Sequence, residues 1–266
     1  MDQLKGRTAV ITGGASGIGL ATARLLTAEG TQCVLVDVEQ GPLEAVAAEL
    51  GATPLVCDVG DRAAVEAVAD TVFERFGTVD IVFNNAGVAV SGPVVEMTHA
   101  DWEWTLRVDL WGPIHGVEAF VPRMVAQGTG GHVLFTASFA GLVANVGLGP
   151  YCVAKYGVVA LAEVLHKELR PHRIGVSVLC PMRVATNIWN AGRNRPAELG
   201  GSAAPAVVPG AAEDDADLAG RVLPVEGVAA QVVDAIRRER LYIVPHPESR
   251  PFVRRRFERI DAAFDD

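Results

Sequence analysis

Short apolar, β-rich runs alternate with longer helical patterns along almost the whole chain of 266 residues. The predicted strands are Thr8–Ile11, Cys33–Asp37, Pro54–Cys57, Ile81–Asn84, His132–Thr136, Gly175–Cys180 and Tyr242–Val244. Helices are predicted near residues 17–29, 42–50, 61–76, 99–126, 151–170 and 226–239. Strands alternating with helices of this length indicate right-handed βαβ units. The alternation therefore predicts an α/β fold, a doubly wound parallel sheet of about seven strands with helices on both faces.

The chain is predicted to form a single domain over residues 1–266, because no repeat or linker divides it. Half of the residues are hydrophobic but only 6% are aromatic, which suits buried strands under closely packed helices. An irregular segment at about 183–224, rich in Gly, Ala and Pro, follows a strand directly and is predicted to be a substrate lid. Residues from about 249 to 266 are predicted to form a C-terminal helical tail.

Charge and hydropathy exclude several classes of protein. A net charge of −9 argues against binding to nucleic acid or to anionic membranes. No apolar run is as long as a membrane span, and the first residues lack a signal peptide's apolar segment, so a cytoplasmic protein is expected. The cysteines (Cys33, Cys57, Cys152 and Cys180) lack metal-ligand spacing, so we interpret them as reduced core residues and predict no metal site.

A glycine-rich turn joins the first predicted strand to the first helix. Such a turn lets backbone N–H groups approach a pyrophosphate, and the helix N-terminus adds partial positive charge. We expect Gly13 to permit the tight turn, Gly17 to allow close approach of the ligand, and Gly19 to let helix pack on strand. The predicted phosphate-binding residues are Gly13, Ser16, Gly17, Ile18 and Gly19.

A carboxylate closes the second predicted strand. Asp37 can accept hydrogen bonds from the hydroxyls of an adenosine ribose. It would also repel a 2′-phosphate, by roughly 1–4 kcal/mol for close like charges. No Lys or Arg stands at Ala15, Ser16 or Val38 to compensate. The pattern therefore favours NAD over NADP as the cofactor.

A tyrosine and a lysine share one face of the helix near 151–170. Tyr151 and Lys155 are four residues apart. Lowering a phenol pKa by roughly two to three units needs about 3–4 kcal/mol. One ammonium at ~4 Å supplies about that much at an intermediate dielectric. Ser138, which follows a predicted strand, can orient a substrate oxygen toward Tyr151. A surface Tyr/Lys pair and a turn serine are the alternative interpretations.

The ordered motifs resemble those of the single-domain short-chain dehydrogenases/reductases, over roughly residues 5–245. The matching segments are Thr12–Gly19, Asp58-Val59, Asn84–Gly87, Ser138, Tyr151–Lys155 and Pro181–Thr186. The resemblance implies a Rossmann-type fold and a homotetramer or homodimer. It also implies that Asp58 and Val59 flank the adenine, that Asn85, Ala86 and Gly87 line the cofactor, that Lys155 holds the nicotinamide ribose, and that Val184 and Thr186 hold the carboxamide.

Two positions depart from the family pattern. Asp109 stands where the family has a catalytic asparagine, which bends a helix and positions a water near the lysine. An ionised carboxylate there would partly offset Lys155 and raise the pKa of Tyr151, which predicts activity with an alkaline-shifted optimum. Met182 replaces a glycine after Pro181, and it either strains the backbone or forms a wall of the substrate pocket.

Together these features predict an NAD(H)-dependent oxidoreductase that moves a hydride between nicotinamide and a hydrophobic secondary alcohol or ketone. The predicted catalytic residues are Ser138, Tyr151, Lys155 and Asp109. The expected pocket walls, each of which could equally be core, are Phe139, Val143, Leu148, Met182, Ile188 and Trp189. The alternatives are a non-catalytic NAD(H)-binding regulator and an NADPH-dependent carbonyl reductase.

Overall fold

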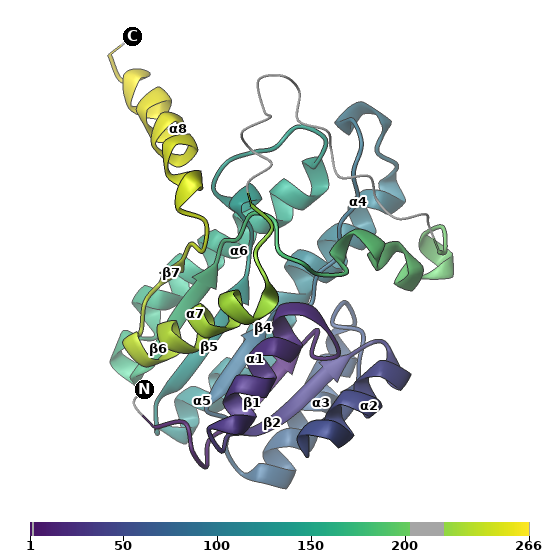
Figure 1. Cartoon of the computed structure of the whole chain (residues 1–266), viewed down its shortest axis with the longest axis vertical. Helices are drawn as coiled ribbons and strands as arrows, with labels where there is room; N and C mark the ends of the chain where they lie inside the picture. The colour runs from purple at the N-terminus through teal and green to yellow at the C-terminus, as the bar shows by residue number, and fades with distance from the viewer. Residues whose placement is uncertain (2, 203–220, 266) are drawn as a thin grey trace.

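The computed structural model, which describes residues 1, 3–202 and 221–265, contains a seven-stranded parallel sheet (Figure 1). Its order is β3-β2-β1-β4-β5-β6-β7, so the chain winds outward from β1 in both directions. The strands are β1 (Thr8–Thr12), β2 (Gln32–Asp37), β3 (Thr53–Val56), β4 (Ile81–Asn84), β5 (Gly131–Thr136), β6 (Ile174–Leu179) and β7 (Tyr242–Ile243). The predicted doubly wound sheet in a single domain is confirmed.

Helices cover both faces of the sheet (Figure 1). On one face lie α1 (Gly17–Ala28), α2 (Gln40–Leu50) and α7 (Val225–Arg238). On the other lie α3 (Arg62–Phe76), α5 (Gly112–Gln127) and α6 (Gly149–Glu168). Each face has its own apolar core: Ile11 and Leu35 point into the first, and Val10 and Val34 into the second. Strands buried on both faces explain why they appear as continuous apolar runs in the sequence.

The predicted helix near 99–126 is interrupted in the structure. It consists of α4 (His99–Leu106), a π-helical turn at Arg107–Trp111, and α5. A π turn carries one extra residue and rotates the side chains that follow it, and such turns often occur at functional sites. Pro122 was expected to kink or end this helix, but α5 continues to Gln127. The helix therefore continues past this proline, and α5 packs against α3.

The ends of β1 and β4 mark the point where the strand order reverses. The two strands pair directly, while the connections after them run to opposite faces. A ligand site of an open α/β sheet lies in the crevice at this edge. Among the described residues, no helix is both long and apolar enough to cross a bilayer.

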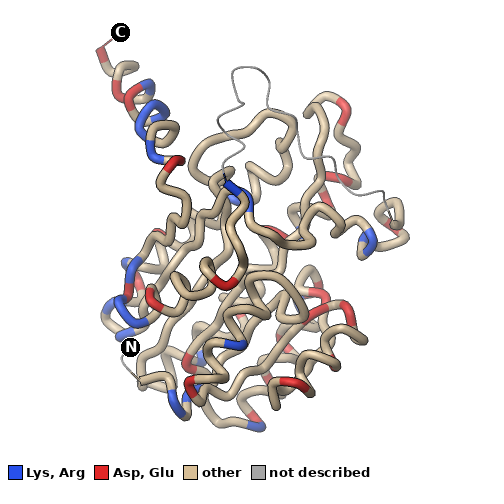
Figure 2. The backbone as a smooth tube through the Cα atoms, in the orientation of Figure 1, with Lys and Arg blue, Asp and Glu red and all other residues tan. Residues whose placement is uncertain are grey.

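The C-terminal helix α8 (Arg250–Ala262) projects away from the rest of the molecule (Figure 1). It has no buried residue, and five of its residues are arginines, at positions 250, 254–256 and 259 (Figure 2). Its first turns touch the body through Phe252, which packs edge-on against Phe139, and through Arg256 above the ring of Tyr156. Phe139, expected either in the pocket wall or in the core, is thus part of the packing under α8.

Candidate active site

Helix α1 begins at the glycine-rich turn with its N-terminus uncapped. Ser16 occupies the capping position, but its side chain accepts no backbone hydrogen bond and no acidic residue lies in the first turn. A Cβ on Gly19 would lie 2.3 Å from the carbonyl oxygen of Gly13, and Gly17 has a φ of +56°. The backbone is thus packed too tightly for side chains and presents free N–H groups. This arrangement fits an anionic phosphate group.

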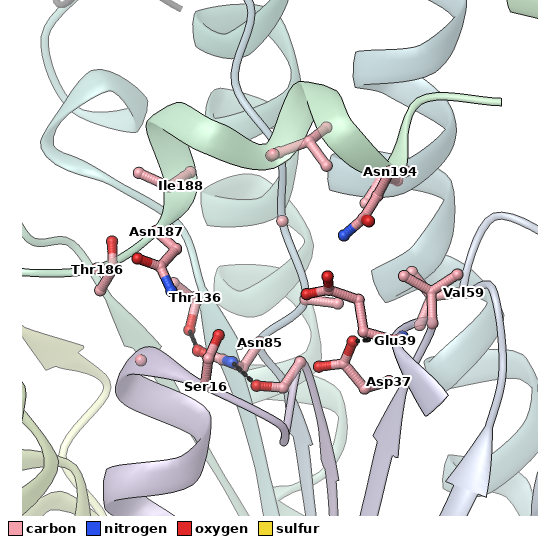
Figure 3. Close-up of a pocket in the computed structure, with 18 of the residues that line it drawn as sticks. Ser16, Asp37, Glu39, Val59, Asn85, Thr136, Thr186, Asn187, Ile188 and Asn194 are labelled. Atoms are coloured by element: carbon pink, nitrogen blue, oxygen red, sulfur yellow. Dashed lines mark hydrogen bonds between the residues drawn. The ribbon is translucent and has the colours of Figure 1, made fainter. Parts of the chain in front are cut away.

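A cavity of about 430 Å³ extends from this turn along the carboxyl edge of the sheet (Figure 3). It is lined by residues predicted for cofactor binding: Gly13, Ser16, Gly17, Ile18, Asp37, Asp58, Val59, Asn85, Ala86, Gly87, Tyr151, Lys155 and Thr186. These residues come from segments spread over most of the sequence, and the fold brings them to one crevice. Its size and shape suit an elongated organic ligand.

At one end of the cavity, Asp37 is held by two backbone N–H groups. Its Oδ2 accepts from Ala15 at 3.1 Å and its Oδ1 from Glu39 at 3.1 Å. The carboxylate is therefore fixed at the end of β2, and each oxygen keeps a lone pair for a ligand hydroxyl. Asp58, one strand further along the edge, pairs with Arg107 at 3.2 Å.

Asn85 joins three neighbouring strands beneath the cavity. Its Nδ2 donates to the carbonyl of Thr12 at 3.0 Å, and its Oδ1 accepts from Thr136 at 2.9 Å. These bonds link β1, β4 and β5 where the strands end. Asn85 therefore stabilises the central sheet at the floor of the cavity.

Tyr151, Lys155 and Asp109 meet at the other end of the cavity. They are only 9%, 1% and 0% exposed, respectively. The Lys155 Nζ lies 3.1 Å from Asp109 Oδ2 and 5.3 Å from the centre of the Tyr151 ring. It also donates to the Thr136 carbonyl at 3.1 Å, while Asp109 Oδ1 accepts from the Val88 N–H at 2.7 Å. The π turn places Asp109 against α6 in this way.

Burial and charge move the pKa values of this cluster. Burial raises the pKa of Tyr151, Lys155 lowers it, and the Asp109 carboxylate raises it further, so the net direction is upward. Burial also raises the pKa of Asp109, against the effect of Lys155. For Lys155, burial acts downward, but Asp109 and Tyr151 outweigh it and raise the pKa. The ammonium is therefore stable in this site, although its effect on the phenol is partly cancelled by the neighbouring carboxylate.

Asp109→Asn is expected to move the pH profile of kcat toward lower pH. The amide removes the negative charge that holds the pKa of Tyr151 up, and it can still bend the helix and accept from Val88. A group whose pKa falls reaches its deprotonated form at lower pH, so the limb that rises with pH should move in the acid direction. Rate measurements across pH on both proteins test this, and superimposable profiles would refute it.

Three other predicted residues lie around this cluster. Ser138 begins a short 3-10 turn, where its hydroxyl accepts from the Ala140 N–H at 3.1 Å, and its hydrogen bond with Tyr151 acts to lower the phenol pKa. Thr186 lines the cavity, whereas Val184 pairs with Leu223 through the backbone and is not among the lining residues. The structure thus brings Ser138 and Thr186 to the site and places Val184 at its margin.

Met182 has an ordinary backbone conformation. Among the described residues other than glycine, only Arg173 and Glu239 have a positive φ, so methionine causes no left-handed strain at this position. Its N–H donates to Nδ1 of His246 at 3.1 Å. Met182 is not among the residues that line the cavity. The expected strain after Pro181 is therefore absent.

Sequence reasoning missed His246, which is fully buried beside this segment. Because its Nδ1 accepts from Met182, its Nε2 carries the proton and donates to the carbonyls of Arg183 and Arg221, each at 3.1 Å. One imidazole thus links two segments of the chain, residues 182–184 and residues 221–223. A single histidine within a polar C-terminal stretch carried no motif that could have identified it.

His246→Ala should lower the free energy of unfolding by about 1–3 kcal/mol, the cost of a buried group left without its partner. The Met182 N–H and the two carbonyls would lose their hydrogen bonds. Urea denaturation measures the change, and the exposed His172→Ala serves as the control. Equal midpoints for the two variants would contradict the structural role.

A second missed feature is an arginine near Asp37. Arg193 lies in a turn, η5 (Ile188–Asn194), above the cavity, and forms a bidentate pair with Glu39. The sequence has no Lys or Arg at Ala15, Ser16 or Val38, and it gives no sign that Arg193, 154 residues from Glu39 along the chain, lies at this end of the cavity. No local pattern could have revealed this contact.

Comparison with known proteins identifies the family. A family model described as short chain dehydrogenase matches residues 7–196, which cover most of the sheet and the whole Tyr151–Lys155 cluster. The chain is a short-chain dehydrogenase/reductase.

Relatives of this short-chain dehydrogenase/reductase span nearly its full length. The C alpha-dehydrogenase of Sphingobium sp. (strain NBRC 103272 / SYK-6) is 35% identical, with 98% of this chain and 87% of that protein covered. The 1-deoxy-11-beta-hydroxypentalenate dehydrogenase of Streptomyces exfoliatus is 34% identical, with 96% and 88% covered. A crystal structure of a short-chain dehydrogenase/reductase from Burkholderia phymatum in complex with NAD superposes with a TM-score of 0.90, at 38% identity over 99% of this chain and 97% of that one. The chain is therefore an oxidoreductase of this family.

Proposed function

We propose that this oxidoreductase uses NAD(H) to interconvert a hydrophobic secondary alcohol and its ketone. The proposal rests on one cavity, which is lined by the N-terminus of α1, the carboxylate of Asp37 and the Tyr151–Lys155 pair. The N-terminus of α1 is uncapped. A ribose acceptor, a phosphate-binding turn and a proton-transfer group match the successive parts of a dinucleotide and its substrate.

The residues present fit a nicotinamide dinucleotide. The N–H groups at the start of α1 would hold its pyrophosphate, Asp37 the adenosine ribose, and Thr186 the carboxamide. Two of the three Lys155 donors are directed at Asp109 and Thr136, which leaves one for the nicotinamide ribose. When bound, the nicotinamide supplies the hydride acceptor or donor. The similar Burkholderia phymatum structure is described as a complex with NAD, which supports this choice of cofactor.

The chain's own groups would carry the proton chemistry. In the oxidation direction the Ser138 hydroxyl holds the alcohol oxygen, and the Tyr151 phenolate accepts the alcohol proton. Lys155 stabilises the phenolate electrostatically, and the positive charge of an oxidised nicotinamide would lower the pKa of Tyr151 further. In the reduction direction Tyr151 returns its proton to the ketone oxygen.

An apolar patch beside Tyr151 supports a hydrophobic substrate. Ala89, Ala140, Leu148 and Cys152 form a buried cluster with Tyr151, and Ile188 and Trp189 pack against it. Leu148, Ile188 and Trp189 are three of the expected pocket walls. One relative is named as a dehydrogenase of 1-deoxy-11-beta-hydroxypentalenate, a hydroxylated compound. These features favour a bulky alcohol or ketone without a charged group next to the reacting carbon.

The proposal is tested by following NADH formation over a panel of secondary alcohols, from small aliphatic to alicyclic and terpenoid. We expect turnover with NAD, higher kcat/KM for the larger apolar alcohols, and weak activity on analogues that carry a carboxylate next to the carbinol carbon. NADH binding without turnover of any alcohol or ketone would instead support a regulator. Preference for NADPH in the reduction direction would support the carbonyl-reductase alternative.

A further inference from the structure

A cation lies at the Asp37 end of the cavity and is held by Glu39, the residue that precedes α2. The Arg193 Nε and Nη2 donate to Glu39 Oε1 and Oε2 at 3.0 and 2.5 Å, and its Nη1 donates to the Asn190 carbonyl at 2.6 Å. Both side chains are partly buried, at 33% and 25% exposed. All three nitrogens of the guanidinium are therefore engaged, which is the geometry of a strong bidentate pair.

Glu39 lies beside the carboxylate that is proposed to hold the adenosine ribose. Figure 3 shows Asp37 and Glu39 next to each other at the cavity, with Asn194 above them. The Glu39 N–H donates to Asp37 Oδ1, so the positions of the two residues are coupled. Hydrogen bonding to Glu39 raises the pKa of Arg193, and the charge of Asp37 acts in the same direction. Asp37, Glu39 and Arg193 line the same cavity, so a ribose held at Asp37 would lie on the side of the cavity that carries Arg193.

This position of Arg193 bears on the choice between NAD and NADP. An arginine next to the ribose hydroxyls is the feature by which dinucleotide sites accept a 2′-phosphate. Among the described residues that line the cavity, the cations are Arg193 and Lys155, and Lys155 lies at the other end with Asp109. Glu39 accepts from Nε and Nη2 of Arg193 and neutralises its charge, while the Asn190 carbonyl accepts from Nη1. The guanidinium is thus present but unavailable.

We propose that the Glu39–Arg193 ion pair is a second determinant of cofactor choice, which prevents Arg193 from binding a 2′-phosphate and so reinforces the repulsion by Asp37. The inference rests on the proposed use of NAD(H). Glu39 is the residue that controls selectivity, and Arg193 is the group it controls.

The segment that carries Arg193 has a separate attachment. Arg195 Nη1 pairs with Asp101 on α4 at 2.5 Å, and its guanidinium lies 5.4 Å from the centre of the Trp104 ring. This second ion pair is more buried than the first, at 10% and 16% exposed. Loss of the Glu39 charge should therefore free Arg193 without releasing the segment from the molecule.

The test is isothermal titration of NADH and NADPH into the wild type, Glu39→Gln, Arg193→Ala and the double variant. In Glu39→Gln we expect the Kd for NADPH to fall roughly tenfold, the gain from one charge-assisted contact that Asp37 partly opposes, while the Kd for NADH changes little. Addition of Arg193→Ala should abolish this gain. Titration with adenosine 2′,5′-bisphosphate and 5′-AMP should show the same change in the ratio of the two Kd values. These two ligands lack the nicotinamide, so it contributes nothing to that change.

Glu49→Gln is the matched control. Glu49 lies on α2, the helix that follows Glu39, pairs with Arg24 at 2.9 Å, and is not among the residues that line the cavity. Glu49→Gln removes the same charge and should leave the ratio of the Kd values for NADH and NADPH unchanged. The inference is overturned if Glu39→Gln weakens the binding of NADH and NADPH equally. It is also overturned if Glu49→Gln lowers the Kd for NADPH as much as Glu39→Gln does. A wild type that binds neither dinucleotide would instead refute the proposed function.

Discussion

Tyr151→Phe is expected to reduce kcat by roughly 10²–10⁴-fold, the usual contribution of a positioned acid–base group. The ring keeps its packing in the apolar cluster with Leu148 and Cys152, so the fold should be preserved. Only the hydroxyl that exchanges the proton is lost. The Kd for NADH should stay within about twofold, because the pyrophosphate and ribose contacts proposed for the cofactor lie elsewhere in the cavity.

The same helix offers a matched control. Tyr156 lies on α6 but is not among the cavity-lining residues, and its ring contacts Arg256 of α8. Tyr156→Phe should retain nearly full kcat and the same NADH affinity. Steady-state kinetics and NADH titration of both variants give the comparison. Retention of wild-type kcat by Tyr151→Phe would refute the assignment of Tyr151 as the proton-transfer group.

Lys155→Met is expected to remove activity and also to lower the free energy of unfolding by about 3–5 kcal/mol. The substitution leaves the fully buried Asp109 without its cation. Burial already raises the pKa of Asp109, and Lys155 is what opposes this. The destabilisation should therefore be largest at high pH and smaller as the pH falls, because protonation of the carboxyl removes the unpaired charge.

The double variant Lys155→Met/Asp109→Asn separates the two effects. It removes both charges, so it should regain most of the lost stability while kcat remains low. Lys167→Met, an exposed lysine of the same helix, is the control for the loss of a positive charge. Urea denaturation at several pH values measures stability. A double variant no more stable than Lys155→Met would contradict the buried ion pair.

The sequence predicted the sheet well because its signals are local. The central strands are apolar runs buried on both faces, and β1 ends just before Gly13 and β2 at Asp37, where the chain turns. The position of Asp109 was also visible, since the motif order identified it. What the sequence could not show was the local geometry, the π turn that divides the helix predicted near 99–126.

The parts that escaped prediction depend on contacts between distant segments. The Glu39–Arg193 pair and the hydrogen bonds of His246 join residues with no common motif or periodicity. Phe139 was ambiguous for the same reason, because an apolar residue after a strand suits both a pocket wall and a core. In the structure the Phe139 ring packs against Phe252 of the projecting helix.

The hydrogen bonds of His246 have a consequence for how such an enzyme acquires new substrates. Its imidazole fixes the points where the chain leaves the sheet after Met182 and returns at Arg221. Among the described residues between these points, Pro196 is the last that lines the cavity, so insertions or exchanges after it should leave the nucleotide site intact. Exchanges that include Thr186 or Arg193 should instead alter the cofactor contacts and the substrate side together.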